Sequence, residues 1–305
     1  MSYLYHNDKR LMSIYAFFRR RPRIENPKVI MTLLVRDEID IIERHLRYHT
    51  GSGIDGLIVT DHQSQDGTRE ILEQYRKTGA ILELIDEPSP AYDQVAWVHR
   101  MIERARDHYG ADYCINSDAD EFWYAKGGSL RSELVRSRVS KIKCPSYNML
   151  PPAEGGFWTA TDCVQRGIPK RFPLDGFNVL FHKPTHKVIH RTQGYCRITP
   201  GNHGVGMADD ISERSRTIRL YHYNIRSREQ FKRKMLQGGA AMEANINSGE
   251  KEGSHWRHFY RGYQAGLIDF DEEFDKVIGR RQLAELRRLG CVVTDPTMRD
   301  IFATL

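Results

Sequence analysis

Three carboxylates stand close together in residues 116–123. Asp118 and Asp120 are two positions apart, and Glu121 follows directly. Like charges at this spacing repel unless a cation or a shared proton offsets them. Carboxylate oxygens suit Mg²⁺ or Mn²⁺, ions that commonly bind together with phosphate. An acidic turn that caps the next helix is the alternative, but the apolar run before it and the aromatic pair after it favour a metal and phosphate site.

Two other polar clusters also follow predicted strands. Residues 29–35 form a continuous apolar run, typical of a strand covered on both faces, and the charged residues 36–38 come next. Residues 57–61 form a similar run that ends at an aspartate, Asp61. Ligands bind beyond the carboxyl ends of strands in open parallel sheets. The sequence therefore predicts that these clusters and the carboxylates at 118–121 converge on one crevice.

Helical spacing of apolar residues separates these strands. Alternation of strands and helices with short links predicts parallel pairing and right-handed crossovers. The pattern is lost beyond Phe231. We expect helices over residues 39–50, 68–78 and about 93–109, and a third strand over residues 80–85.

Composition describes a globular chain of 305 residues with 40% hydrophobic residues. No apolar run approaches the roughly 20 residues of a membrane helix. The five cysteines form no C-x-x-C pair. We therefore expect neither a disulfide framework nor a structural zinc site, and a reducing cytoplasm fits best.

The formal net charge of +6 is concentrated in residues 1–30 and 214–234. Such patches serve phosphates, anionic lipid or nucleic acid, or are only a solvated face. No zinc finger or RNP-type motif is present, so we expect no nucleic-acid partner. Residues 1–27 place Leu11, Ile14, Tyr15 and Phe18 at helical spacing beside an arginine cluster. This pattern predicts a helix on the inner surface of a membrane or, equally, one docked on the protein's own core.

Residues 29–123 resemble a family 2-type glycosyltransferase of the GT-A fold, in the bacterial branch with a DxDEF motif. The matching pieces are T-L-L-V-R-D-E at 32–38, I-V-T-D-H-Q-S-Q-D-G-T at 58–68 and N-S-D-A-D-E-F at 116–122. L-Y-H-Y-N at 220–224, R-S-R-E-Q-F at 226–231 and Lys234 extend the resemblance. It implies a GT-A-like (Rossmann-like) α/β domain over residues 28–235, with a mixed, mainly parallel sheet flanked by helices. Residues 241–305 match nothing, and residues 236–305 are expected to form a helical C-terminal extension.

The same resemblance implies transfer of a sugar from a nucleotide diphosphate, expected to be a UDP-sugar, to an acceptor hydroxyl. The acceptor would be a saccharide or lipid-linked saccharide in cell-surface polysaccharide or glycolipid synthesis. A divalent cation, Mn²⁺ or Mg²⁺, would stabilise the leaving diphosphate. Asp120 is the first expected metal ligand, and Asp118 would meet the metal or the ribose. His222 matches a downstream metal or diphosphate contact of the family, with His203 behind it, although a packed core histidine is the alternative for His222.

The nucleotide is expected to lie against Thr32, Arg36, Glu38, Asp61 and Asp118. Asp61 would accept from a uracil N–H or a ribose hydroxyl, unless it only caps a turn. Arg36 would face the base or the phosphates, unless it pairs with a neighbouring carboxylate.

The catalytic base stays unassigned. An inverting transfer needs a group that takes the acceptor proton. Glu154, Asp162 and Asp175 lie in a plausible region, but the sequence distinguishes none of them.

Two other classes of protein remain open. An aspartate-nucleophile phosphatase also places D-x-D at a strand end and would form a phosphoaspartate. A non-catalytic basic adaptor would bind anionic polymer or membrane, and its binding would weaken steeply with salt.

Overall fold

The computed structural model describes residues 20–89, 92–244 and 253–305. The predicted membrane-surface helix of residues 1–27 therefore falls mostly outside the described residues. In the part of the chain that is described, no helix has the length and hydropathy to cross a membrane.

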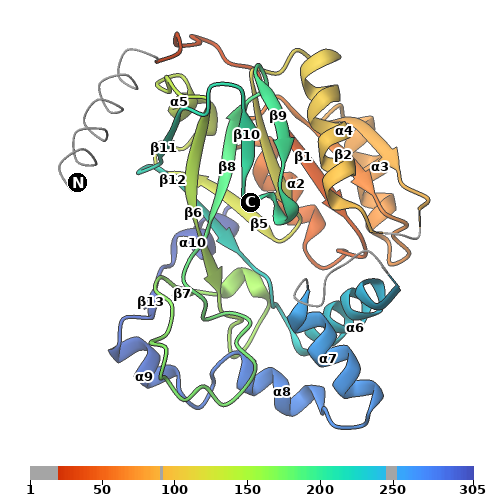
Figure 1. Cartoon of the computed structure of the whole chain (residues 1–305), viewed down its shortest axis with the longest axis vertical. Coiled ribbons are helices and arrows are strands. Elements are labelled where there is room, and N and C mark those ends of the chain that lie inside the picture. Colours follow the sequence, from red (N-terminus) through yellow and green to blue (C-terminus); the bar gives the residue numbers. More distant parts are fainter. Residues whose placement is uncertain (1–19, 90–91, 245–252) are drawn as a thin grey trace, which may run out of the picture.

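A parallel block forms one half of an eleven-stranded sheet, in the order β3-β2-β1-β4. Figure 1 shows β1 and β2 of this block beside α3 and α4. Every residue of β1 and β2 is buried, which explains their continuous apolar runs. The connecting helices cover the faces of this block, as parallel strands require. The strands are β1 (Val29–Val35), β2 (Gly56–Asp61), β3 (Ile81–Asp86) and β4 (Tyr113–Asp118), and the helices are α2 (Ile42–Thr50), α3 (Thr68–Lys77) and α4 (Gln94–Asp107).

The other half of the sheet is mixed. Beyond β4 the order continues as β8-β6-β7-β13 with antiparallel pairing, and β12 pairs with both β5 and β6. The added strands are β5 (Glu121–Ala125), β6 (Lys141–Met149), β7 (Asp162–Val164), β8 (His186–Arg191), β11 (Ser212–Arg214), β12 (Ile218–His222) and β13 (Val292–Thr294). A separate hairpin of β9 (Tyr195–Ile198) and β10 (Val205–Met207) packs near α4. The fold class predicted from the sequence, a mixed α/β sheet flanked by helices with a helical C-terminal part, is confirmed.

The C-terminal residues are built into the core of the molecule. Helix α6 (Arg228–Ala244) runs across the predicted boundary at residue 235, and β13 joins the sheet by pairing with β7. The ring of Phe302 lies 4.9 Å from that of Phe122, directly behind the acidic turn. The remaining helices are α5 (Leu130–Leu134), α7 (Ser254–Gln264), α8 (Phe270–Val277), α9 (Leu283–Arg288) and α10 (Thr297–Phe302), with 3₁₀ turns η1 (Phe157–Thr159) and η2 (Pro200–Asn202).

A chain of hydrogen bonds ties β1, β4 and β8 together inside the sheet. Thr32 Oγ1 donates to Asn116 Oδ1 at 2.7 Å, and Asn116 Nδ2 lies 3.1 Å from His190 Nε2. His190 Nδ1 lies 2.9 Å from the Arg191 carbonyl oxygen, which can only accept, so the proton of the ring is on Nδ1. Both ring nitrogens are thus used in the neutral form, and burial lowers the pKa of His190 to about 4.

We expect the protein to lose stability in mild acid. Burial also lowers the pKa of His45 to about 4. Because an unfolded histidine titrates near 6.5, the unfolded chain binds more protons below that pH, and stability falls as the pH drops from about 6.5 to about 4. Each of the two histidines should lower the free energy of unfolding by about 2 kcal/mol between pH 7 and pH 5. Urea denaturation of the wild type and of His190→Gln at both pH values measures this, since the variant should lose one histidine's share of the pH dependence. An equal pH dependence in the two proteins would contradict the assignment.

Candidate active site

The loop after β2 holds the loop after β1 in place. Ser64 Oγ accepts from the Asp37 backbone N–H at 3.1 Å, and Thr68 Oγ1 accepts from the Glu38 backbone N–H at 2.9 Å. Asp37 has a φ of 53° and Gly67 one of 100°, so both loops turn sharply at the strand ends. The D-x-x-S-x-D-G-T run is therefore the scaffold that orients residues 36–38.

The turn between β4 and β5 brings Asp118 and Glu121 onto a buried lysine. Glu121 Oε2 accepts from the Asp118 backbone N–H at 3.1 Å and closes the turn. Lys187 Nζ, from β8, lies 2.7 Å from Glu121 Oε1 and 3.1 Å from Asp118 Oδ2. Burial raises the pKa of Glu121 to about 7, with Lys187 opposing the rise. One of the cations that offset the acidic turn is thus a side chain of the protein.

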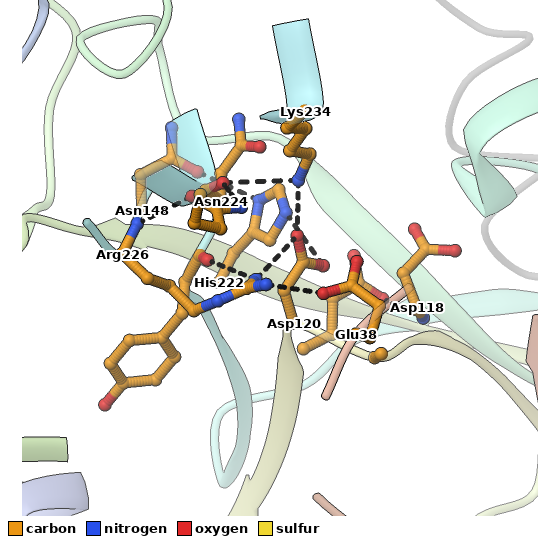
Figure 2. A network of polar contacts seen from close by, with 12 residues as sticks. Glu38, Asp118, Asp120, Asn148, His222, Asn224, Arg226 and Lys234 are labelled. Atoms are coloured by element: carbon orange, nitrogen blue, oxygen red, sulfur yellow. Dashed lines mark hydrogen bonds and ion pairs between the residues drawn. The ribbon is translucent and has the colours of Figure 1, made fainter. Parts of the chain in front are cut away.

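Three side chains that can carry positive charge surround Asp120. Lys234 Nζ lies 2.6 Å from its Oδ2, His222 Nε2 lies 3.3 Å from its Oδ1, and Arg226 Nη1 lies 3.9 Å from Oδ2. Figure 2 shows Lys234 reaching down to Asp120, and Arg226 extending between Asp120 and Glu38. Burial opposes ionisation, but Lys234, His222 and Arg226 outweigh it and hold the pKa of Asp120 well below its usual range.

The pair of Asp120 and His222 fits a divalent cation. Within the described ranges, no group of three or more His, Cys, Asp or Glu residues is arranged to hold a metal ion. However, two ligands at neighbouring corners of an octahedron with bonds of about 2.1 Å are about 3 Å apart, close to the 3.3 Å between Asp120 Oδ1 and His222 Nε2. Asp118 Oδ1 lies 3.5 Å from Gln94 Nε2. The residues present would therefore hold Mn²⁺ or Mg²⁺ by two or three ligands, with the remaining positions open to phosphate and water.

Helix α6 lies across the strand ends and carries cations to the carboxylates. Arg226, just before α6, bonds to Glu38 at 2.5 Å and Asp40 at 2.7 Å. Arg233 Nη2 lies 3.3 Å from Asp40 Oδ1. Burial raises the pKa of Glu38, with Arg226 opposing. These ion pairs fix α6 to the end of β1.

An open cleft of about 700 Å³ lies between α6 and the ends of β1 and β2. Its charged wall includes Arg36, Arg233 and Lys234, and its ring-bearing wall includes Tyr92 and Trp256. The cleft thus has positively charged side chains on one wall and aromatic rings on the other, a combination that suits a phosphorylated compound with an aromatic part.

The structure brings Arg36, Glu38 and the Asp118–Asp120 turn to the same end of the sheet, but Asp61 and Thr32 are enclosed. Asp61 accepts from the Ser64 backbone N–H at 3.1 Å and lies 3.5 Å from Arg69, with 4% of its surface exposed. Its carboxylate therefore caps the loop after β2, the alternative considered from the sequence. Thr32 lies in mid-strand and is used by the hydrogen bond to Asn116.

Thr32→Val is expected to lower the free energy of unfolding by about 1–3 kcal/mol, because the buried Asn116 Oδ1 loses its donor. The affinity for UDP should stay unchanged, since the side chain lies inside the sheet. Urea denaturation and calorimetry on the same variant check both quantities. A variant of normal stability with weakened UDP binding would return Thr32 to the nucleotide site.

His203 lies in the exposed turn of the β9–β10 hairpin. Its Nδ1 is 3.2 Å from the His186 carbonyl oxygen, and burial together with Lys187 lowers its pKa. Gln94 contacts both this turn and the acidic turn. Its Oε1 accepts from the Gly201 backbone N–H at 2.8 Å, and its Nε2 lies 3.5 Å from Asp118 Oδ1.

The three candidate bases are not among the residues that line the cleft between α6 and the ends of β1 and β2. Glu154 is exposed in the loop after β6. Asp162 pairs with Arg287 at 2.7 Å, and Asp175 lines a separate cavity beside α8.

Several site residues escaped the sequence analysis: Asp40, Gln94, Asn148 and Lys187. A partial signal existed in α6, where Gln230, Arg233 and Gln237 recur at helical spacing and share one face. Lys187 and Asn148 stand in ordinary strand sequence. The pairing of β8 with β4 brings Lys187 to the acidic turn, and the pairing of β6 with β12 brings Asn148 to His222.

No protein family and no curated protein matches this chain. Solved structures give weak similarities. S. aureus TarS matches with a TM-score of 0.37 and 12% identity over 80% of this chain and 44% of TarS, so the chain spans less than half of that protein. The mannosyltransferase PcManGT from Pyrobaculum calidifontis, in complex with GDP-Man and Mn²⁺, matches with a TM-score of 0.37 and 11% identity over 96% of this chain and 86% of its own. Glucosyl-3-phosphoglycerate synthase from Mycobacterium tuberculosis, in complex with Mn²⁺, UDP and glucosyl-3-phosphoglycerate, has a TM-score of 0.34 and 14% identity over 80% of this chain and 81% of its own. Similarity at this level assigns neither an activity nor a ligand to this chain.

Proposed function

We propose that this protein is a glycosyltransferase that moves a sugar from a nucleotide diphosphate, a UDP-sugar in the simplest case, to an acceptor hydroxyl. The acceptor in this proposal is a saccharide or a lipid-linked saccharide. The observation that carries the proposal is the pairing of Asp120 Oδ1 with His222 Nε2 at 3.3 Å, next to a cleft whose lining residues Arg226 and Lys234 contact Asp120.

The proposed roles follow from the charges on the cleft walls. A divalent cation held by Asp120 and His222, with Asp118 beside them, would stabilise the negative charge that develops on the leaving diphosphate. Arg36, Arg233 and Lys234 would bind the phosphate oxygens, since all three side chains line the cleft. Lys234 is well suited to this, because its flexible chain bonds Asp120 from a partly exposed position and can donate to a phosphate from there.

The base of the nucleotide would lie against Tyr92 and Trp256. Both rings line the cleft, and Tyr92 packs edge-on against Trp97 with ring centroids 5.5 Å apart. Stacking on aromatic rings binds any base, so these rings supply affinity more than selectivity.

A thermal-shift screen with nucleotides, each with and without Mn²⁺, tests the proposal. We expect a nucleoside diphosphate to raise the melting temperature more when Mn²⁺ is present, and UDP to give the largest rise. Nucleoside monophosphates, which lack the second phosphate, are the matched control. Equal melting temperatures with and without every nucleotide diphosphate would overturn the proposal, and a phosphoaspartate trapped on Asp118 would favour a phosphatase instead.

A further inference from the structure

Asn148 occupies a fixed position behind His222. It lies near the end of β6, directly opposite His222 in the parallel pairing of β6 with β12. Its Oδ1 is 3.1 Å from His222 Nδ1, and its Nδ2 donates to the Leu180 carbonyl oxygen at 2.8 Å (Figure 2 shows the contact with His222). Asn148 thus links the site to the loop before β8.

The bond to Leu180 determines which way the amide of Asn148 faces. A carbonyl oxygen only accepts, so the NH₂ end of the amide must point to Leu180 and the oxygen end to His222. The contact is part-buried, and the Leu180 side chain is fully buried, so the Leu180 carbonyl oxygen is held in place by the core. The alternative orientation would set the amide oxygen against the Leu180 carbonyl oxygen, two acceptors with no proton between them.

The orientation of the amide in turn determines the tautomer of His222. Because Asn148 Oδ1 accepts, His222 Nδ1 must carry the proton, and in the neutral ring Nε2 keeps its lone pair. That lone pair is directed at Asp120 Oδ1, 3.3 Å away. Two electron-rich atoms at this distance attract each other only through a positive charge between them, a proton or a metal ion.

We propose that Asn148 is a positioning residue, which holds His222 in the tautomer that presents a ligating Nε2 beside Asp120. The proposal rests on the proposed function, because it requires a divalent cation in the donor site. Hydrogen-bond partners of this kind orient a ligating histidine, and their removal typically weakens metal affinity by 10–100-fold. If Asn148 had only a structural role, a substitution that leaves the protein folded would change neither the tautomer of His222 nor the dependence of UDP binding on Mn²⁺.

Nitrogen NMR of His222 in the metal-free wild type tests the first step without any substitution. The ¹⁵N shift of Nδ1 should be that of a protonated nitrogen, because the Asn148 oxygen only accepts, while in the metal-free protein a second proton can lie between Nε2 and Asp120. An unprotonated Nδ1 would overturn the proposal.

Two substitutions test the second step. Asn148→Leu has a similar size but accepts no hydrogen bond, so it should mix the tautomers and weaken Mn²⁺ binding in the presence of UDP by about 10–100-fold. Asn148→Asp keeps the acceptor toward His222 but loses the donor to Leu180, so it should lower the melting temperature while Mn²⁺ binding falls less than in Asn148→Leu. Melting temperatures of both variants separate a loss of fold from a loss of the site, and the Asp variant, which keeps the contact with His222, remains informative if the Leu variant does not fold.

Calorimetry of UDP binding with and without Mn²⁺, carried out also on Asp120→Ala, distinguishes a wrong role of Asn148 from a wrong proposed function. If Asp120→Ala abolishes the Mn²⁺ dependence and Asn148→Leu leaves it intact, the role of Asn148 is wrong while the donor site stands. If UDP binding to the wild type, Asp120→Ala and Asn148→Leu is equally insensitive to Mn²⁺, the proposed function itself fails.

Discussion

Asp120→Asn is expected to reduce turnover by about 10²–10³-fold, the loss found when one preorganised electrostatic contact is removed from an active site. The amide cannot supply the negative charge on which Lys234, Arg226 and His222 converge. The fold should tolerate the change, because Arg226 keeps its ion pairs with Glu38 and Asp40. The affinity for UDP should also become independent of Mn²⁺, since the amide is a poor ligand for a hard cation.

Turnover is measured as release of the nucleoside diphosphate, with the donor that the thermal-shift screen selects. The matched control is Asp300→Asn, because Asp300 is exposed and pairs only with its neighbour Arg299 on the described surface. Normal turnover of Asp120→Asn would remove Asp120 from the chemistry, and a similar loss in Asp300→Asn would show that the effect is not specific to the site.

The parallel half of the fold could be predicted because local sequence specifies it. Strands β1 and β2 are buried on both faces, so they read as continuous apolar runs, and the helices between them have one apolar face. Because the ends of these strands could be predicted, the place of residues 36–38 and 118–121 at the edge of the sheet could be predicted as well. The place of the Asp61 carboxylate, which accepts from the Ser64 backbone N–H and lies near Arg69, depends on side-chain contacts that local sequence does not show.

The other half of the site depends on pairing between distant strands, which local sequence does not specify. The family resemblance singled out His222, but its contact with the acidic turn arises because β12 lies between β5 and β6, and no feature of the sequence indicated that pairing. The packing behind the acidic turn also comes from a distant part of the sequence, since Phe302 packs on Phe122. Hydrophobic packing is non-directional, so an apolar residue carries no mark of its partner.

The basic stretch of residues 214–234 shows how charge can mislead. From sequence it is a patch for an anionic partner or a solvated face. In the structure its last part, Arg226 to Lys234, turns inward and neutralises the protein's own carboxylates Glu38, Asp40 and Asp120. Net charge describes solubility and long-range attraction and leaves the internal pairing open.

Lys187→Met is expected to lower the free energy of unfolding by about 3–5 kcal/mol, because it leaves a buried charge without its partner. Glu121 is fully buried and Lys187 is 4% exposed as a side chain, so water cannot replace the lost ammonium group. Methionine fills most of the same volume, which keeps the loss electrostatic. The control is Lys276→Met, whose ion pair with Glu273 lies at the surface and should contribute less than about 1 kcal/mol.

The pH dependence of this loss identifies Glu121 as its source. Burial already raises the pKa of Glu121 to about 7 against the opposition of Lys187, and without the lysine it should rise further. A carboxyl whose folded pKa exceeds its unfolded pKa binds more protons in the folded state, so stability is lost as the pH rises above the unfolded value of about 4.3. Lys187→Met should therefore be much more destabilised at pH 8 than at pH 5. The double variant Lys187→Met with Glu121→Gln should lose most of that pH dependence, because no ionisable group remains at position 121. Urea denaturation of the single and double variants at both pH values decides the matter, and a loss in Lys187→Met that is equal at pH 5 and pH 8 would show that Glu121 is not the unpaired charge.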